Sequence, residues 1–136
     1  MKSRLVVVAV IQKNGEYLVG QKPKNVGPYP NTWHIPGGGV DLNNESSEEA
    51  LKREIREETG IEIQNVRAVG FDEDEVPNKH GEMTRYVFLD YEADYLSGDI
   101  KANDDMAVLK WVRKEELKTL NLNKPCEKLF KKLKLI

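Results

Sequence analysis

Residues 39–61 read GVDLNNESSEEALKREIREETGI and combine the signals of a helix with a high density of carboxylates. Ser46 and Glu49 have the spacing of a capping box, in which each side chain bonds a free backbone N–H at the start of a helix. Gly60 is suited to a left-handed cap at the other end. The stretch therefore predicts a helix that begins near Ser46 and ends at Gly60.

Three glutamates of this predicted helix share one face. Glu54, Glu57 and Glu58 are spaced i, i+3, i+4, and their carboxylates would repel one another unless cations lie among them. Hard divalent cations prefer oxygen ligands, and Mg²⁺ is the usual one beside phosphates. The glycine run at 37–39 can approach the helix closely and offer backbone carbonyls. These residues predict a metal site of the kind that hydrolyses diphosphates.

Short apolar runs on both sides of this stretch predict strands. The first two strands, 5–11 and 17–20, are joined by Asn14-Gly15, a strong hairpin signal. Further strands are expected at 33–35, 61–71, 85–93 and 108–112, and further helices at 114–120 and 125–135. Residues 22–31 and 72–84 are expected to be loops. Strands mixed with helices predict an α/β fold with a mixed sheet between helices.

The composition narrows the class of protein. A chain of 136 residues fits one domain, and a net charge of −2 gives no electrostatic footprint for duplex nucleic acid or an anionic membrane. No segment has the ~20 apolar residues that span a bilayer. Lys2 and Arg4 before an apolar run resemble the start of a signal peptide, but no cleavage site follows, which favours a buried strand. The single Cys126 excludes an internal disulfide and favours a cytoplasmic location.

The spacing of residues 39–61 resembles a known family signature. It is similar to the Nudix box at every defined position: Gly39, Glu45, Arg53, Glu54, Ile55, Glu57, Glu58, Gly60 and Ile61. Residues 33–38 and the pair Trp111-Val112 resemble further segments of that family. The resemblance implies one Nudix hydrolase domain over residues 1–136, folded as an α/β/α sandwich with a central mixed β-sheet. The competing interpretation is a solvated helix rich in Glu and Arg.

The resemblance also implies roles for the matched residues. The implied metal ligands are the Gly39 carbonyl and the carboxylates of Glu54, Glu57 and Glu58. The implied cofactor is Mg²⁺, with Mn²⁺ able to substitute. Glu54 and Glu57 would be catalytic, with Glu54 a candidate general base, while Arg53 would orient a catalytic glutamate. Glu45 would hold Arg53, and both Glu45 and Gly60 would be structural.

Two acidic runs outside the box leave alternatives open. Asp105 precedes Trp111 by six residues, where the family often supplies a further metal ligand or base. A polar turn at residues 103–105 explains the same residues. Residues 72–75 are either a solvated loop or strand end, or a source of another ligand.

The substrate is expected to be a nucleotide, with attack by water on one phosphorus. The favoured reaction converts a nucleoside triphosphate, normal or oxidised, into a monophosphate and pyrophosphate. Asn123, before Pro125, resembles a base-reading Asn of MutT-type members, although it also suits a helix N-cap. Trp33 and Gly38 are further substrate-binding candidates, with core packing as the alternative for Trp33.

Two other functions remain open at this stage. Pro77, sixteen residues after Ile61, resembles a proline of family members that cleave ADP-ribose or a dinucleotide, although MutT-type members can carry one nearby too. A non-enzymatic nucleotide-sensing module is the third candidate, because one fold can serve binding as well as catalysis. The chain is expected to act as a monomer or a homodimer.

Overall fold

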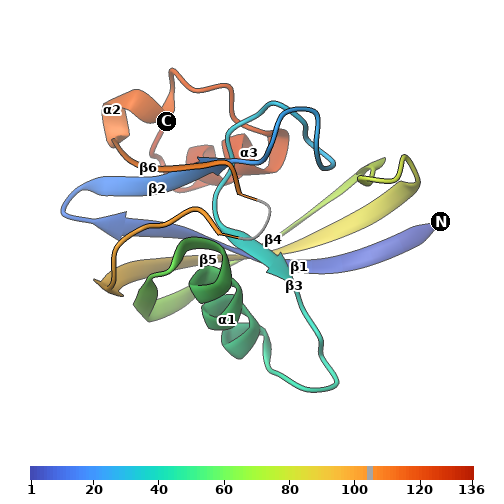
Figure 1. Ribbon diagram of the computed structural model, residues 1–136, viewed down its shortest axis with the longest axis horizontal. Helices are drawn as coiled ribbons and strands as arrows, with labels where there is room; N and C mark the ends of the chain where they lie inside the picture. Colours follow the sequence, from blue (N-terminus) through green and yellow to red (C-terminus); the bar gives the residue numbers. More distant parts are fainter. Residues whose placement is uncertain (104–105) are drawn as a thin grey trace.

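The computed structural model describes residues 1–103 and 106–136, which form a sheet with helices on both faces (Figure 1). The strands are β1 (Lys2–Lys13), β2 (Glu16–Gln21), β3 (Gly37–Gly39), β4 (Glu62–Pro77), β5 (Met83–Ser97) and β6 (Val108–Arg113). The helices are α1 (Ser47–Thr59), α2 (Lys114–Leu117) and α3 (Lys124–Lys132). In this described part of the chain, no helix has the length and apolar character needed to cross a membrane.

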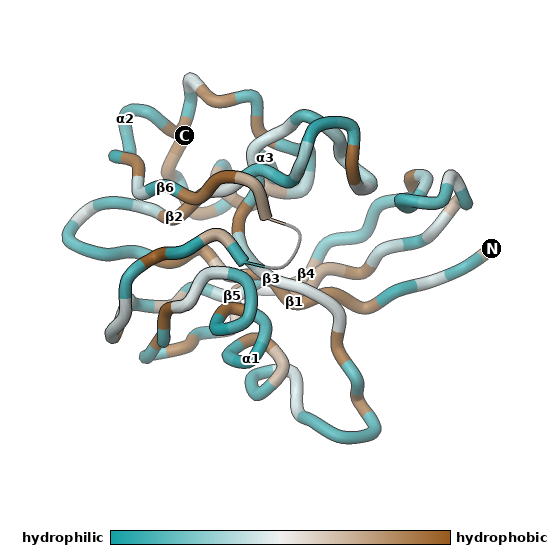
Figure 2. Tube along the Cα trace, viewed as in Figure 1, coloured by the Kyte–Doolittle hydropathy of each residue, from teal (hydrophilic) through white to brown (hydrophobic). Residues whose placement is uncertain are grey.

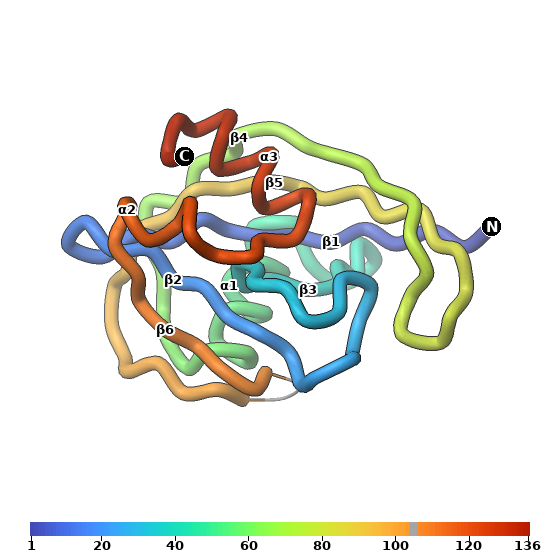
Figure 3. The backbone as a smooth tube through the Cα atoms, turned by 90° about the horizontal axis from the view of Figure 1, so that it is seen from above, coloured from blue at the N-terminus to red at the C-terminus, as the bar shows by residue number. Residues whose placement is uncertain are grey.

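The sheet is mixed, as the sequence predicts. Its strand order is β4-β5-β1-β2-β6, and β1 and β5 run parallel while the other pairs are antiparallel. Figure 3 shows β4, β5 and β1 side by side along the sheet. Strand β2 pairs with β1 only at Gln12 and Lys13, next to the Asn14-Gly15 turn. Beyond that point β3 takes its place and pairs antiparallel with Val6, Val7 and Val8.

Both faces of the sheet are buried, so the molecule has two cores. Successive side chains of a strand point to opposite faces. Along β1, Val7, Ala9 and Ile11 therefore join Leu51 and Ile55 of α1 in one core. The residues between them pack with α3 in the second core, which contains Val10, Val19, Ile35, Val112, Leu117, Leu122, Cys126, Leu129 and Phe130. Burial on both sides explains why residues 5–11 are continuously apolar (Figure 2).

Helix α1 has the ends that its sequence predicts. The Ser46 hydroxyl accepts a hydrogen bond from the Glu49 N–H, and the Glu49 carboxylate accepts one from the Ser46 N–H. Gly60 has a φ of 81° and donates its N–H to the Arg56 carbonyl. These caps satisfy backbone groups that would otherwise lack partners at the helix ends, and they fix which residues face the sheet.

Some element boundaries differ from those expected. The glycines at 37–39 form a strand instead of ending one, because β1 offers a free edge where β2 diverges. Residues 72–77 belong to β4 and not to a loop, since they pair with β5 and Glu75 forms an ion pair with Arg85. The hydrogen bonds of this ladder stabilise a strand here, although the polar sequence of these residues does not indicate one. Helix α2 has only four residues, and α3 ends at Lys132.

Phe130 is the largest fully buried side chain, and its loss should be costly. We expect Phe130→Ala to lower the free energy of unfolding by about 3–5 kcal/mol, measured by urea denaturation, because it leaves a cavity beneath α3. Phe71→Ala is the matched control, since that ring is 65% exposed. Its effect should stay within about 0.5 kcal/mol. Equal losses in the two variants would contradict the assignment of the second core.

Candidate active site

The glycine strand β3 lies directly against the acidic face of α1. The Gly37 N–H donates to Oε1 of Glu58 at 3.3 Å. A Cβ on Gly38 would collide with the Glu54 carboxylate, and one on Gly37 would collide with the backbone carbonyl of Val7. The strand therefore fits between β1 and α1 only because it has no side chains. This close approach brings backbone groups of β3 beside the carboxylates of the helix.

Arg53 gathers the oxygens of this region around one guanidinium group. Its Nη1 donates to Oε1 of Glu54 at 2.9 Å and to Oε2 of Glu57 at 3.1 Å. Its Nη2 donates to the Gly39 carbonyl at 3.3 Å. Two further bonds, of 2.8 and 2.6 Å, join the guanidinium to the Glu45 carboxylate in a bidentate pair. Such a pair fixes the plane of the guanidinium as well as its position.

The surroundings shift the pKa values of these groups. Hydrogen bonds from Arg53 lower the pKa of Glu45 to about 2, and the same contacts raise the pKa of Arg53. Burial raises the pKa of Glu54, although Arg53 and the nearby Arg4 oppose that effect. Glu58 is buried, with 7% exposure, whereas the Glu57 side chain is 49% exposed. The glutamates therefore share a face but lie in different environments.

The donor set has the chemistry that a divalent cation requires. Among residues 1–103 and 106–136, no three His, Cys, Asp or Glu side chains converge into a group able to hold a metal ion. Oxygens of Gly39, Glu54 and Glu57 nevertheless all reach one cation, the Arg53 guanidinium. Carbonyl and carboxylate oxygens are the ligands of hard divalent ions. An ion bound here would compete with Arg53 for them, while Glu45 would keep its own bonds to Arg53.

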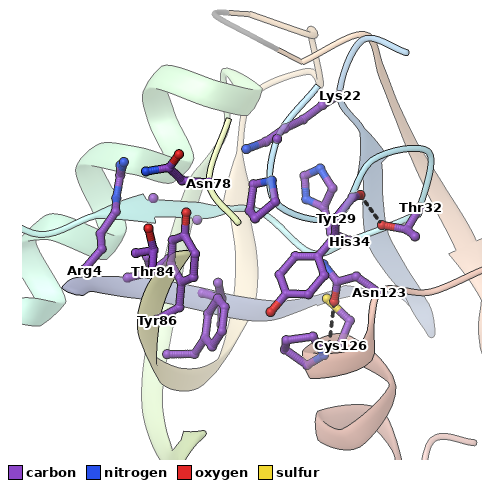
Figure 4. Close-up of a pocket in the computed structure, with 18 of the residues that line it drawn as sticks. Arg4, Lys22, Tyr29, Thr32, His34, Asn78, Thr84, Tyr86, Asn123 and Cys126 are labelled. Atoms are coloured by element: carbon purple, nitrogen blue, oxygen red, sulfur yellow. Dashed lines mark hydrogen bonds between the residues drawn. The ribbon is translucent and has the colours of Figure 1, made fainter. Parts of the chain in front are cut away.

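A cavity of ≈ 440 Å³ opens beside this acidic face (Figure 4). This volume is within the usual range for small-molecule sites. Gly38 and Glu58 belong to both the cavity wall and the α1–β3 contact. The remaining wall comes from β1, β5, the loop after β2, the β4–β5 hairpin and the start of α3. The cavity is therefore next to the carboxylates and is built from elements far apart in the sequence.

Paired residues of the parallel strands β1 and β5 define two ends of the cavity. In the β1–β5 register Arg4 is beside Tyr86, Val6 beside Phe88 and Val8 beside Asp90, and all six line the cavity. Arg4 lies at the α1 end, where its guanidinium occupies the space next to Gly39. Asp90 lies at the α3 end, close enough to Cys126 for its charge to affect that thiol. The two ends are four residue steps apart, or ~13 Å.

Aromatic rings line the middle of the cavity. Tyr86 and Phe88 stack with centroids 6.0 Å apart, and the Tyr29 ring is 6.5 Å from Phe88. The Tyr29 hydroxyl donates to Oδ2 of Asp74 at 2.7 Å, which ties the loop after β2 to β4. Rings held in this way offer flat apolar surfaces to a ligand.

The comparisons with known proteins agree with this geometry. The family model described as "NUDIX domain" matches residues 1–133. The chain belongs to the Nudix family. A relative named "Nucleoside triphosphatase NudI" from Enterobacter sp. (strain 638) is 33% identical over 96% of both chains.

Solved Nudix structures share the fold. The MutT NUDIX hydrolase from Burkholderia pseudomallei has a TM-score of 0.82 at 24% identity, covering 98% of this chain and 99% of that one. The NUDIX domain of Shewanella oneidensis NrtR, solved with ADP ribose, has a TM-score of 0.78 at 18% identity, covering 98% and 88%. At these identities the likeness establishes the Nudix fold alone.

Four Nudix box residues, Gly39, Glu45, Glu54 and Glu57, contact Arg53 directly, whereas the substrate candidates are divided. Gly38 and Asn123 line the cavity, and Asn123 also caps α3, since its Oδ1 accepts from the Cys126 N–H at 2.8 Å. Trp33 lies outside the lining, with its ring packed near α3 and Lys110 Nζ 4.7 Å from the ring centroid. Asp105 lies outside the described residues. The acidic run at 72–75 is in β4, with Asp74 bonded to Tyr29.

Sequence reasoning missed several cavity residues of this Nudix protein. Arg4, Tyr86, Phe88 and Asp90 were not singled out as site residues. The alternation of Tyr86, Phe88 and Asp90 along β5 was the available signal, because residues two apart share a face. The pairing of β5 with β1, which places Arg4 in the same wall, had no local signal.

Gly38 and Gly37 should respond differently to substitution by Ala. In Gly38→Ala the obstacle is the flexible end of Glu54, so we expect near-normal stability and ~10-fold weaker Mn²⁺ binding by calorimetry as that carboxylate moves. In Gly37→Ala the obstacle is a backbone carbonyl that cannot move, so unfolding should become easier by several kcal/mol. Unchanged Mn²⁺ affinity in a folded Gly38→Ala would count against Glu54 as a ligand.

Asp90 should make the protein less stable as the pH rises. Burial, with repulsion from Asp72, raises its pKa from 3.8 to about 6, while Lys132 opposes the shift. The unfolded chain therefore loses this proton at lower pH than the folded one, and stability falls between about pH 4 and 6. The full change is about 3 kcal/mol, because each pKa unit corresponds to ~1.4 kcal/mol.

Urea denaturation at pH 4, 5.5 and 7 would measure this effect. Asp90→Asn should gain stability over the parent protein as the pH rises. Asp94→Asn is the control of opposite sign, because hydrogen bonds from Asn65, Gln12 and Arg67 lower the pKa of Asp94. That variant should lose stability relative to the parent as the pH rises mainly below about pH 4, so between pH 4 and 7 its difference from the parent should change little. A pH-independent difference for Asp90→Asn would contradict its raised pKa.

Proposed function

We propose that this Nudix protein is a magnesium-dependent pyrophosphohydrolase that converts a nucleoside triphosphate into a monophosphate and pyrophosphate. The observation that carries the proposal is the position of the acidic α1–β3 contact beside an aromatic-lined cavity. A relative that is 33% identical over nearly the whole chain bears the name nucleoside triphosphatase, which supports this substrate class.

The charges around the cavity suit a triphosphate at the α1 end. Lys2, Arg4, Lys22 and Lys79 all line the cavity. In Figure 4 Arg4 and Asn123 lie on opposite sides of the cavity. Of these four cavity-lining cations, Arg4 lies next to Gly39, and its charge acts on Glu54. We assign Arg4 to the phosphate chain, which it would hold beside the metal-binding oxygens.

The proposed metal ligands are the Gly39 carbonyl and the carboxylates of Glu54, Glu57 and Glu58. A divalent ion bound there would neutralise phosphate oxygens and lower the pKa of water. We propose Mg²⁺ as the ion, with Mn²⁺ able to substitute, because the available donors are oxygens and the substrate carries phosphates.

The residues of the chain would then position and activate the reactants. Arg53 is a positioning residue, because it reaches Glu54 and Glu57 from the fixed anchor of Glu45. We propose Glu54 as the group that accepts the proton of the attacking water, since burial raises its pKa toward the range useful for a general base. The cavity would hold the diphosphate bond beside these groups.

Location, domain organisation and assembly are extensions of this proposal. We propose a cytoplasmic enzyme in which residues 1–136 act as one domain, as a monomer or a homodimer. The single cysteine is buried, in keeping with a reducing compartment. Asp105 is retained as a candidate ligand or base on the strength of the family resemblance alone.

A panel of nucleotides would test the reaction. Purified protein with Mg²⁺ should release pyrophosphate from at least one normal or oxidised nucleoside triphosphate. Glu57→Gln should lower kcat/KM at least ~100-fold, because a proposed metal ligand loses its charge. Glu48→Gln is the matched control on the same helix, since Glu48 faces solvent and pairs only weakly with Lys52 at 3.7 Å. It should retain activity within about twofold.

Two other outcomes would overturn the proposal. Cleavage of ADP-ribose or NADH with no pyrophosphate released from triphosphates would identify the alternative pyrophosphatase. Tight nucleotide binding without turnover, unaffected by Glu57→Gln, would identify a sensing module.

A further inference from the structure

Asp90 is a buried carboxylate in the cavity wall with no role in the proposed phosphate chemistry. It is only 6% exposed, and it lines the cavity at the end away from Arg4. Within the described residues, no hydrogen bond or ion pair of its side chain is found. Burial of a carboxylate is destabilising in general, and a carboxylate with perturbed surroundings in a cavity wall is a candidate for contact with a ligand.

The geometry of the cavity decides which part of a nucleotide would reach Asp90. This step rests on the proposed function, which places the phosphates beside Arg4 and α1. The base is at the opposite end of a nucleotide, and the parallel register of β1 and β5 puts Asp90 ~13 Å from the row of Arg4. Tyr86 and Phe88 lie between the two ends, where they can contact the sugar and the base. Asp90 is therefore placed to meet the edge of the base.

Asn123 supplies a hydrogen-bond donor at the same end of the cavity. Its Oδ1 is occupied by the Cys126 N–H, so the amide orientation is fixed. The Nδ2 group has no partner among the described residues, and the side chain lines the cavity. Asp90 is near this cap, because its charge acts on Cys126. The base end thus combines an N–H donor from Asn123 with a carboxylate acceptor from Asp90.

We propose that Asp90, acting with Asn123, selects bases that carry a carbonyl beside a ring N–H over bases that carry an amino group beside a bare ring nitrogen. Guanine, hypoxanthine, uracil and thymine belong to the first class, and adenine and cytosine to the second. The Asn123 amide donates to the carbonyl, and the Asp90 carboxylate accepts from the N–H. Adenine and cytosine would set donor against donor and lone pair against lone pair.

Substrate discrimination tests this assignment directly. We would measure kcat/KM with Mg²⁺ at pH 8 for GTP, ITP and UTP against ATP and CTP. The parent protein should favour the first group at least ~10-fold, and Asp90→Asn should reduce that preference at least ~10-fold. This is the scale of a lost hydrogen bond to a charged group. A purely structural Asp90 would change all five substrates equally.

Asp72→Asn is the matched control for this measurement. Asp72 is the neighbouring carboxylate on β4, but it lies outside the cavity lining and is 3.7 Å from Lys128 Nζ. The control should keep the parent preference within about twofold. Equal loss of preference in the two variants, or no preference in the parent protein, would overturn the proposal.

A ligand-side measurement needs no variant and no turnover. Calorimetry of the parent protein would compare GMP with 1-methyl-GMP, in which a methyl group replaces the ring N–H that would donate to Asp90. Binding should weaken at least ~10-fold on methylation, and equal affinities would overturn the proposal. If the protein binds GMP more tightly than 1-methyl-GMP but hydrolyses no triphosphate, the proposed function is wrong and the role of Asp90 in base recognition stands. If the protein hydrolyses triphosphates but binds the two ligands equally, the proposed function stands and the role of Asp90 is wrong.

Discussion

The close packing of a bare glycine strand between β1 and α1 is the constraint on which the rest of the structure depends. Strand β3 fits there because Gly37 and Gly38 leave room for the Val7 carbonyl and the Glu54 carboxylate. The same approach satisfies the buried Glu58 with the Gly37 N–H. A packing requirement therefore fixes the positions of the oxygens that we propose as metal ligands, and the chemistry needs no separate scaffold.

Charge balance in this region is organised by one side chain. Arg53 is anchored by two bonds to Glu45 and reaches Glu54 and Glu57 with its other nitrogen. Carboxylates that would repel one another are thus held together before any metal ion arrives. The anchor also gives Arg53 a place to remain when an ion takes over the other oxygens. Glu45, eight residues before Arg53 in the box spacing, acts through that anchor and not on the substrate.

The parallel pairing of β1 with β5 links the acidic face to the opposite end of the cavity. It sets Arg4 and Asp90 in one wall at a separation suited to a nucleotide. Asp90 is unfavourable for stability above about pH 6, since burial raises its pKa. A group that costs stability and faces a cavity is typical of residues retained for binding. Asp90 thus combines an unfavourable burial with a place in the cavity wall.

The sequence alone determined the family, the helix α1 with both caps, and the residues of the acidic face, because these features depend on local spacing. It also predicted the mixed sheet and the Asn14-Gly15 hairpin. Only the tertiary structure showed that residues 72–77 continue a strand, that Trp33 packs away from the cavity, and that Asn123 both caps α3 and lines the cavity. Only the fold brings Arg4 and Asp90 into one wall, because the pairing of β1 with β5 joins residues 82 apart in the chain, and no local pattern encodes such a contact.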